Sequence, residues 1–128
     1  MANGDPGELF ETQLVQRADG ITILHLAGEI DMSSASALVD QFTAISEQRL
    51  DNVILDATNV SFIDSTGLHA LTEGKRMIHE QGTRLFLVPS LQVRRVLELV
   101  FPEPLFAARV NSVEEALSQI QLQPTADR

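Results

Sequence analysis

Residues 59–71 read Asn-Val-Ser-Phe-Ile-Asp-Ser-Thr-Gly-Leu-His-Ala-Leu, and this stretch decides the fold because it joins a strand to a helix. The preceding run, residues 52–57, is apolar and β-branched, as buried strands of parallel sheets are. After the turn, one face of a helix is marked at helical spacing by Leu68, Leu71, Lys75 and Ile78. The connection must therefore be a tight turn at Asp64 and Ser65.

This turn is where we expect the chemistry of the chain. Asp64 and Ser65 are residue types that cap helix N-termini, and Gly67 keeps the first helical turn free of a side chain. A helix begins with unpaired N–H groups and a partial positive charge, so a hydroxyl placed there is exposed and open to modification. Phe62 and Ile63 precede the turn in what we expect to be a loop, where exposed apolar side chains are unfavourable unless they pack or meet a partner. Most Asp-Ser pairs before a helix are only caps, so the turn alone does not establish a function.

The rest of the chain alternates strands and helices. We expect strands at residues 10–17, 21–28, 52–57, 83–88 and 106–110, with a helix after each but the first. Asp19-Gly20 predicts a hairpin, so the first two strands should be antiparallel neighbours, with the second toward the middle of the sheet. Right-handed crossovers make the later strands parallel. The prediction is an α/β domain with a mixed, mostly parallel sheet of about five strands and about four helices, in the order β-β-α-β-α-β-α-β-α.

Helix ends and chain ends can also be read from the sequence. We expect a C-terminal glycine at Gly82, a cap at Ser90 and a capping box at Ser112-x-x-Glu115. The helix after the second strand is expected to be capped by Asp31, Ser33 or Ser34. We predict a disordered lead-in at residues 1–8, one domain at 9–122 and a frayed tail at 123–128.

Composition narrows the class of function. The chain of 128 residues is long enough for one domain with a real core. It has neither a signal peptide nor an apolar run of about 18 residues, which predicts a cytoplasmic protein without a membrane segment. The lack of cysteine excludes disulfides, thiolate catalysis and zinc–cysteine sites. Acidic residues outnumber basic ones 18 to 9, which argues against nucleic acid as a partner.

Residues 56–68, from the end of the strand to the start of the helix, resemble the signature of STAS domains, and within them the anti-sigma-factor antagonists of bacteria. Residues 26–31, Leu-Ala-Gly-Glu-Ile-Asp, are similar to the L-x-G-E-[LI]-D segment of the same family. Residues 93–99 are similar to its helix after the fourth strand. The resemblance extends over about residues 10–120 and implies a STAS-type fold.

The resemblance also implies a partner switch. In that family, an anti-sigma factor that is also a serine kinase captures the unmodified antagonist and releases its sigma factor. Phosphorylation of the serine after the signature aspartate dissolves the complex, and a serine phosphatase resets it. By position, Ser65 is the phosphoacceptor, Asp64 its flanking acid, and Asp31 a partner contact or simply a helix cap. Thr66 stands where the family more often has a second serine, and we favour Ser65 as the modified residue.

The remaining partner-binding candidates surround the same turn. Phe62, Ile63 and Leu68 can edge a hydrophobic docking patch. Gly67 and Leu68 serve mainly as backbone clearance and core, and Thr66 adds a second hydroxyl. Phosphorylation adds about −1.5 to −2 charges. A helix N-terminus tolerates such a group, so we expect little change in the fold and a large change in docking.

Catalysis, metal and cofactors are not expected. His69 and His79 lack the i, i+4 spacing of a metal pair, and His69 should face solvent beside the helix. The residues before Ser65 lack the first glycine of a G-x-S-x-G elbow, and the turn lacks the glycines and lysine of a phosphate loop. We therefore expect no enzyme, and a monomer that forms transient complexes. The alternative is a non-switching STAS module, either a subunit of a transport or signalling complex or a sensor of a small ligand.

Overall fold

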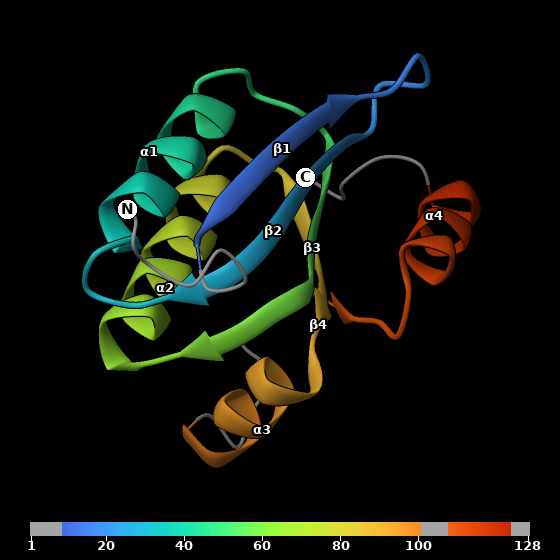
Figure 1. The fold of residues 1–128 in the computed structure, drawn as a ribbon. Helices are drawn as coiled ribbons and strands as arrows, with labels where there is room; N and C mark the ends of the chain where they lie inside the picture. Colours follow the sequence, from blue (N-terminus) through green and yellow to red (C-terminus); the bar gives the residue numbers. More distant parts are fainter. Residues whose placement is uncertain (1–8, 101–107, 124–128) are drawn as a thin grey trace.

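A computed structural model of the chain describes residues 9–100 and 108–123. Within them the elements follow in the order β1 (Glu11–Gln16), β2 (Thr22–Ile30), α1 (Ala35–Ser46), β3 (Asn52–Ile63), α2 (Ser65–Glu80), β4 (Arg84–Pro89), α3 (Leu91–Val100), β5 (Ala108–Arg109) and α4 (Val113–Leu122) (Figure 1). This order confirms the α/β prediction. The predicted lead-in (1–8), residues 106–107 of the predicted fifth strand and the predicted tail after residue 123 lie outside the described residues.

The described strands form one five-stranded sheet in the order β1-β2-β3-β4-β5. β1 and β2 are antiparallel, and the pairs β2–β3, β3–β4 and β4–β5 are parallel, so the sheet is mixed and mostly parallel as predicted. The turn between β1 and β2 contains Gly20 at φ +85°, a conformation that glycine adopts easily. The Asp19-Gly20 hairpin prediction is confirmed.

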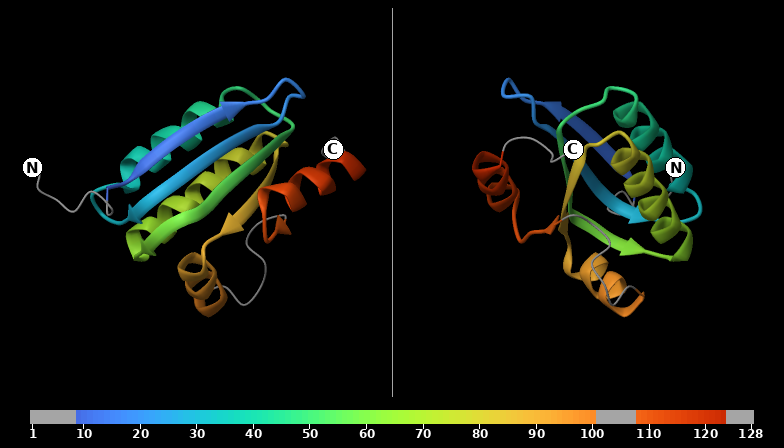
Figure 2. Two further views of the ribbon diagram at one scale, coloured as in Figure 1. Left: turned by 45° about the vertical axis from the view of Figure 1, so that its right-hand side comes forward. Right: turned by 180° about the vertical axis from the view of Figure 1, so that it is seen from behind.

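Helices cover both faces of the sheet. α1 and α2 lie side by side on one face, and α4 lies on the other, near β3 and β4 (Figures 1 and 2). The larger core joins α1, α2 and α3 to the sheet, and its fully buried members include Leu24, Leu38, Phe42, Leu55, Leu71, Ile78 and Leu87. The smaller core lies under α4 and includes Ile23, Ile54, Phe86, Val88, Ala116 and Ile120. Because α4 packs over β3 and β4, no helix in the described part of the chain covers the second face near β1 and β2, which is called the open face below.

β3 is longer than the sequence predicted. We expected it to end near Ala57 and placed Phe62 and Ile63 in a loop, but the strand continues to Ile63. Its first half lies between β2 and β4, whereas the second half pairs with β2 alone among the described strands. There Glu29 lies opposite Phe62, and Ile30 opposite Ile63. A strand half with one neighbour accommodates polar residues, which gave it the sequence pattern of a loop.

The helix ends follow the predicted signals. After α2, Gly82 has φ +79°, its N–H donates to the carbonyl of His79, and the N–H of Thr83 donates to the carbonyl of Ile78, which together form a Schellman motif. Ser90 Oγ accepts from the N–H of Val93 at the start of α3. At α4, Ser112 Oγ accepts from the N–H of Glu115, while the Glu115 carboxylate accepts from the N–H of Asn111. The capping box is thus present, with its return bond shifted by one residue.

Candidate functional site

α2 begins at a capped N-terminus that follows β3 without an intervening loop. The backbone of Asp64 is extended, and its Oδ1 accepts a hydrogen bond from the N–H of Gly67 at 2.9 Å. Its carbonyl accepts from the N–H of Leu68 at 2.8 Å. Asp64 is therefore the N-cap of α2, as predicted, and its carboxylate lies in the favourable field of the helix N-terminus.

Ser65 is the first residue of α2, and its side chain is exposed, whereas Thr66 is half-buried. Within the described residues the Ser65 hydroxyl makes no hydrogen bond. The first turn of α2 contains no acidic side chain after the cap. A modifying enzyme can therefore reach this hydroxyl without opening the fold.

Gly67 lets the start of α2 lie directly against the end of β2. A Cβ at this position would be 2.3 Å from the carbonyl oxygen of Ile30 and 2.8 Å from its Cγ2. The same carbonyl accepts a hydrogen bond from the N–H of Asp64 at 3.2 Å. The position of Ser65 is thus fixed by a close approach of backbone to backbone.

The three apolar residues expected to edge a docking patch lie in different environments. Ile63 and Leu68 are 6% and 8% exposed and belong to the larger core. Phe62 is 45% exposed. Ile63 and Leu68 therefore hold the turn in place from inside, and Phe62 alone of the three offers much surface.

The loop from β2 to α1 is held by its own side chains. Oδ1 of Asp31 accepts from the N–H of Ser33 at 2.9 Å and from the Ser33 hydroxyl at 2.7 Å. The hydroxyl of Ser34 accepts from the N–H of Asp31 and donates to the carbonyl of Glu29 at 2.8 Å. Ser34 occupies the N-cap position of α1 but makes no side-chain cap bond to the helix. Asp31, Ser33 and Ser34 therefore stabilise the loop instead of capping α1 with their side chains, because those side chains form hydrogen bonds within the loop.

These hydrogen bonds also favour the charged form of the Asp31 carboxyl. The Ser33 hydroxyl is the main donor, and it lowers the pKa of the Asp31 carboxyl from its ordinary value of 3.8. Asp31 is thus a carboxylate at neutral pH. It is held in a fixed position next to the strand end that leads to Asp64.

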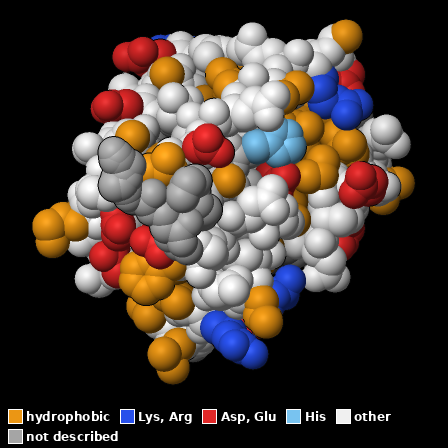
Figure 3. Space-filling view, in the orientation of Figure 1, with side chains coloured by type: hydrophobic (Ala, Val, Ile, Leu, Met, Phe, Trp, Pro, Cys, Tyr) orange, Lys and Arg blue, Asp and Glu red, His pale blue; other side chains and the backbone are white. Residues whose placement is uncertain are grey.

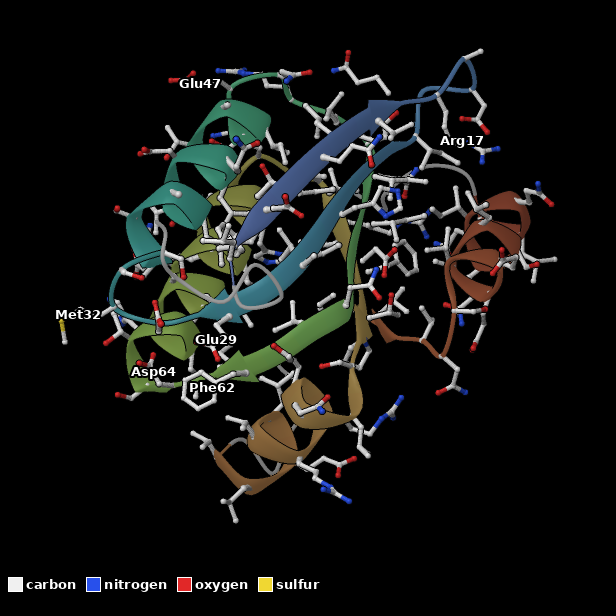
Figure 4. All side chains as sticks on the ribbon, viewed as in Figure 1. Arg17, Glu29, Met32, Glu47, Phe62 and Asp64 are labelled. Atoms are coloured by element: carbon white, nitrogen blue, oxygen red, sulfur yellow. The ribbon has the colours of Figure 1, made fainter. Side chains whose placement is uncertain are left out.

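Met32, at the tip of this loop, was not singled out from the sequence. Its side chain is 79% exposed, and Figure 4 shows it at the same end of the molecule as Glu29, Phe62 and Asp64. The pairing of β2 with β3 and the bond from the N–H of Asp64 to the carbonyl of Ile30 hold this loop next to the start of α2. An apolar residue in an otherwise polar turn is the signal that could have found it.

The chain segments around this loop and the start of α2 carry acidic residues and no basic ones. Residues 18–48 and 50–74 contain no lysine or arginine. The strand ends and turns within them carry Glu29, Asp31 and Asp64. In Figure 3, which has the orientation of Figure 1, acidic and hydrophobic side chains lie along the left margin of the molecule, and no Lys or Arg side chain is seen at the middle of that margin.

Other chemical groups lie outside this site. His69 and His79 are exposed, as predicted for His69. His25 lies in the second strand as expected, on the open face of the sheet, with its Nδ1 2.7 Å from Oδ2 of Asp56. In residues 9–100 and 108–123 no group of three or more histidine and acidic side chains is arranged to hold a metal ion. None of the helices described there has the length and apolar content of a membrane span.

The sequence profile of the STAS domain matches residues 13–100, which is most of the chain. The chain belongs to the STAS domain family. Among curated proteins, this STAS domain is 26% identical over 101 residues to the anti-sigma F factor antagonist of Paenibacillus polymyxa, covering 75% of this chain and 86% of that protein.

Solved structures share the STAS fold. An anti-sigma factor antagonist from Mycobacterium paratuberculosis superposes with a TM-score of 0.75 at 22% identity, over 93% of this chain and 99% of that one. SpoIIAA, a Bacillus cell fate determinant, superposes in its phosphorylated form with a TM-score of 0.65 at 21% identity, over 86% of this chain and 99% of that one. At these identities the two structures establish the fold.

Proposed function

We propose that this STAS domain is an anti-sigma-factor antagonist. Its unphosphorylated form binds an anti-sigma factor that is also a serine kinase and thereby frees a sigma factor. Phosphorylation of Ser65 turns this binding off, and a serine phosphatase restores it. The observation that supports the proposal most is the exposed, unbonded hydroxyl of Ser65 at the N-terminus of α2. The similarity of this chain to an anti-sigma F factor antagonist is consistent with the proposal.

The switch follows from charge. Phosphorylation adds about −1.5 to −2 charges to Ser65. A helix N-terminus stabilises negative charge, so the fold is retained and the effect falls on the partner. A kinase must place its nucleotide phosphates against the hydroxyl that it modifies. After the reaction, the phosphate on Ser65 therefore faces the negative charge of the nucleotide that remains in the kinase. A contact between like charges costs on the order of several kcal/mol, which is enough to dissociate a tight complex.

We assign the surrounding residues two kinds of role. Asp31 and Asp64 contact basic groups of the partner, and Phe62 adds apolar contact. Ile63, Gly67 and Leu68 position the turn, because they are buried or closely approached. Thr66 is half-buried and is the less accessible hydroxyl.

The same proposal extends to the setting of the protein. We expect it to act in the cytoplasm, as a monomer that forms transient complexes, with residues 9–122 as its working unit. We expect no turnover of its own, because no base hydrogen-bonds to Ser65 in the described part of the chain.

The test uses three variants and the anti-sigma kinases of the host. Ser65→Ala should bind constitutively, Ser65→Asp should lose binding by about tenfold or more, and Thr66→Ala should behave as the unsubstituted chain. Binding is measured by titration calorimetry without ATP. Equal affinity of the Ala and Asp variants at position 65 would refute the switch.

A second candidate is a non-switching STAS module that senses a small ligand. It is favoured by a hollow of about 640 Å³ on the open face of the sheet, whose lining includes Glu11, Gln13, His25 and Asn59. Side chains that donate and accept hydrogen bonds suit a small polar molecule. Such a module would tolerate both substitutions of Ser65, so the same titrations distinguish the two functions.

A further inference from the structure

The loop between β2 and α1 presents an apolar side chain that the fold does not use. Met32 is 79% exposed, yet its loop is held by the bonds of Asp31, Ser33 and Ser34 described above. The Met32 side chain is therefore exposed to solvent on a loop whose backbone is held in place. Phe62, across the paired ends of β2 and β3, is exposed as well.

We propose that Met32 is the apolar anchor of the surface that docks the partner of Ser65, and that its thioether is a second modification site whose oxidation weakens docking. The inference rests on the proposed function for the identity of the partner, the anti-sigma kinase. The partner surface must combine an apolar pocket for Met32 with basic groups around it, because the loops are acidic and residues 18–48 and 50–74 contain no lysine or arginine. An unbranched, polarisable side chain adapts to such a pocket.

Oxidation converts the apolar side chain of Met32 into a polar one. The thioether sulfur attacks one oxygen of hydrogen peroxide, the O–O bond breaks, an S–O bond forms and water leaves; the sulfur is oxidised by two electrons and the peroxide is reduced. The product, methionine sulfoxide, is polar and loses apolar contact with a pocket, and dedicated reductases reverse it. The oxidation state of Met32 would thus be a second input to docking, separate from Ser65.

The chain favours reaction at this residue. It has no cysteine, so no thiol consumes the oxidant first, and it has three methionines. Met77 packs partly buried against the larger core, and its sulfur lies 3.7 Å from the Thr43 hydroxyl. Met32 is far more exposed, so peroxide should reach it before Met77.

The first arm of the test needs no partner. The folded chain is treated with hydrogen peroxide and the products are mapped by peptide mass spectrometry over time. Sulfoxide at Met32 should form at least about five times faster than at Met77, as expected from its exposure. Equal rates would overturn the modification site, with the Met32→Leu variant as the mass control.

The second arm titrates the host's anti-sigma kinases against the untreated chain, the oxidised chain and three variants. Oxidised chain and Met32→Gln should each lose about tenfold or more in affinity, whereas peroxide should leave the affinity of Met32→Leu at its value before treatment, and Leu122→Gln should bind as the untreated chain. Leu122 is a matched control because it is 86% exposed at the end of α4. Circular dichroism of each form confirms that the fold is retained.

The outcomes separate this inference from the proposed function. If Ser65→Asp loses binding while Met32→Gln and the oxidised chain bind normally, the Met32 anchor is wrong and the Ser65 switch stands. If Met32→Gln loses binding while Ser65→Asp keeps it, the anchor stands and the switch fails. If the untreated chain binds none of the kinases, both are overturned.

Discussion

Substitution of Gly67 by alanine should both destabilise the domain and displace the candidate site. The added Cβ would lie 2.3 Å from the carbonyl oxygen of Ile30, where an ordinary contact needs more than 3 Å, so α2 or the end of β2 must shift. The clash is with backbone that cannot rotate away, so overpacking here should cost the upper part of its usual range, about 2–3 kcal/mol. Alanine recovers up to about 1 kcal/mol through its better helix propensity. We therefore expect a net loss of about 1–2 kcal/mol.

The assay is urea unfolding monitored by circular dichroism, with a thermal scan beside it. For a domain of this size a loss of about 1–2 kcal/mol corresponds to a decrease in Tm of about 4–8 °C. Ser65→Ala is the matched control in the same helical turn, because its side chain is exposed and unbonded, and its stability should change by less than about 0.5 kcal/mol. If Gly67→Ala were as stable as the unsubstituted chain, the close approach of α2 to β2 would be wrong, and with it the basis for placing Ser65.

Three further predictions concern the surrounding structure. Asp64→Ala should lose about 1 kcal/mol of stability in urea unfolding, whereas Asp64→Asn, which keeps a capping oxygen, should lose only a few tenths; equal losses would contradict the cap. Gly74→Ala should lose about 1–2 kcal/mol in the same assay, because its Cβ would be 2.1 Å from the buried ring of Phe42 and this overpacking outweighs the gain of about 1 kcal/mol in helix propensity; no loss would show that α1 and α2 are less closely packed. The pKa of Asp31 is lowered in the folded chain, so its carboxylate stabilises the fold at every pH above its ordinary pKa of 3.8. This contribution is lost as the pH falls through the lowered pKa of the folded chain. NMR titration should show that Ser33→Ala raises the pKa of Asp31 toward 3.8, and an unchanged pKa would contradict the role of the Ser33 hydroxyl.

The parts of the fold that depend on local chemistry could be predicted from the sequence. The element order, the cap at Asp64, the hairpin at Asp19-Gly20 and the glycine after α2 all follow from residue types at fixed spacing. A cap or a left-handed glycine needs only its immediate neighbours in the chain. These signals fixed where Ser65 lies, which is why the candidate site was found.

The parts that depend on pairing between distant segments could not be predicted. The second half of β3 is a strand because β2 lies beside it, and its mixture of polar and apolar residues does not indicate that neighbour. For the same reason Ile63 was expected in a loop, whereas it is the last residue of β3 and is buried. Met32 gained its position next to the site only through the pairing of β2 and β3, and the bond between His25 and Asp56 joins adjacent strands in the same way.

The most direct test of the account is the mass of the intact chain after incubation with ATP and each anti-sigma kinase of the host, followed by peptide mapping. The account predicts the gain of one phosphate, located on Ser65, absent in Ser65→Ala and retained in Thr66→Ala. Phosphate located on Thr66, or no phosphate from any kinase that binds the chain, would contradict it.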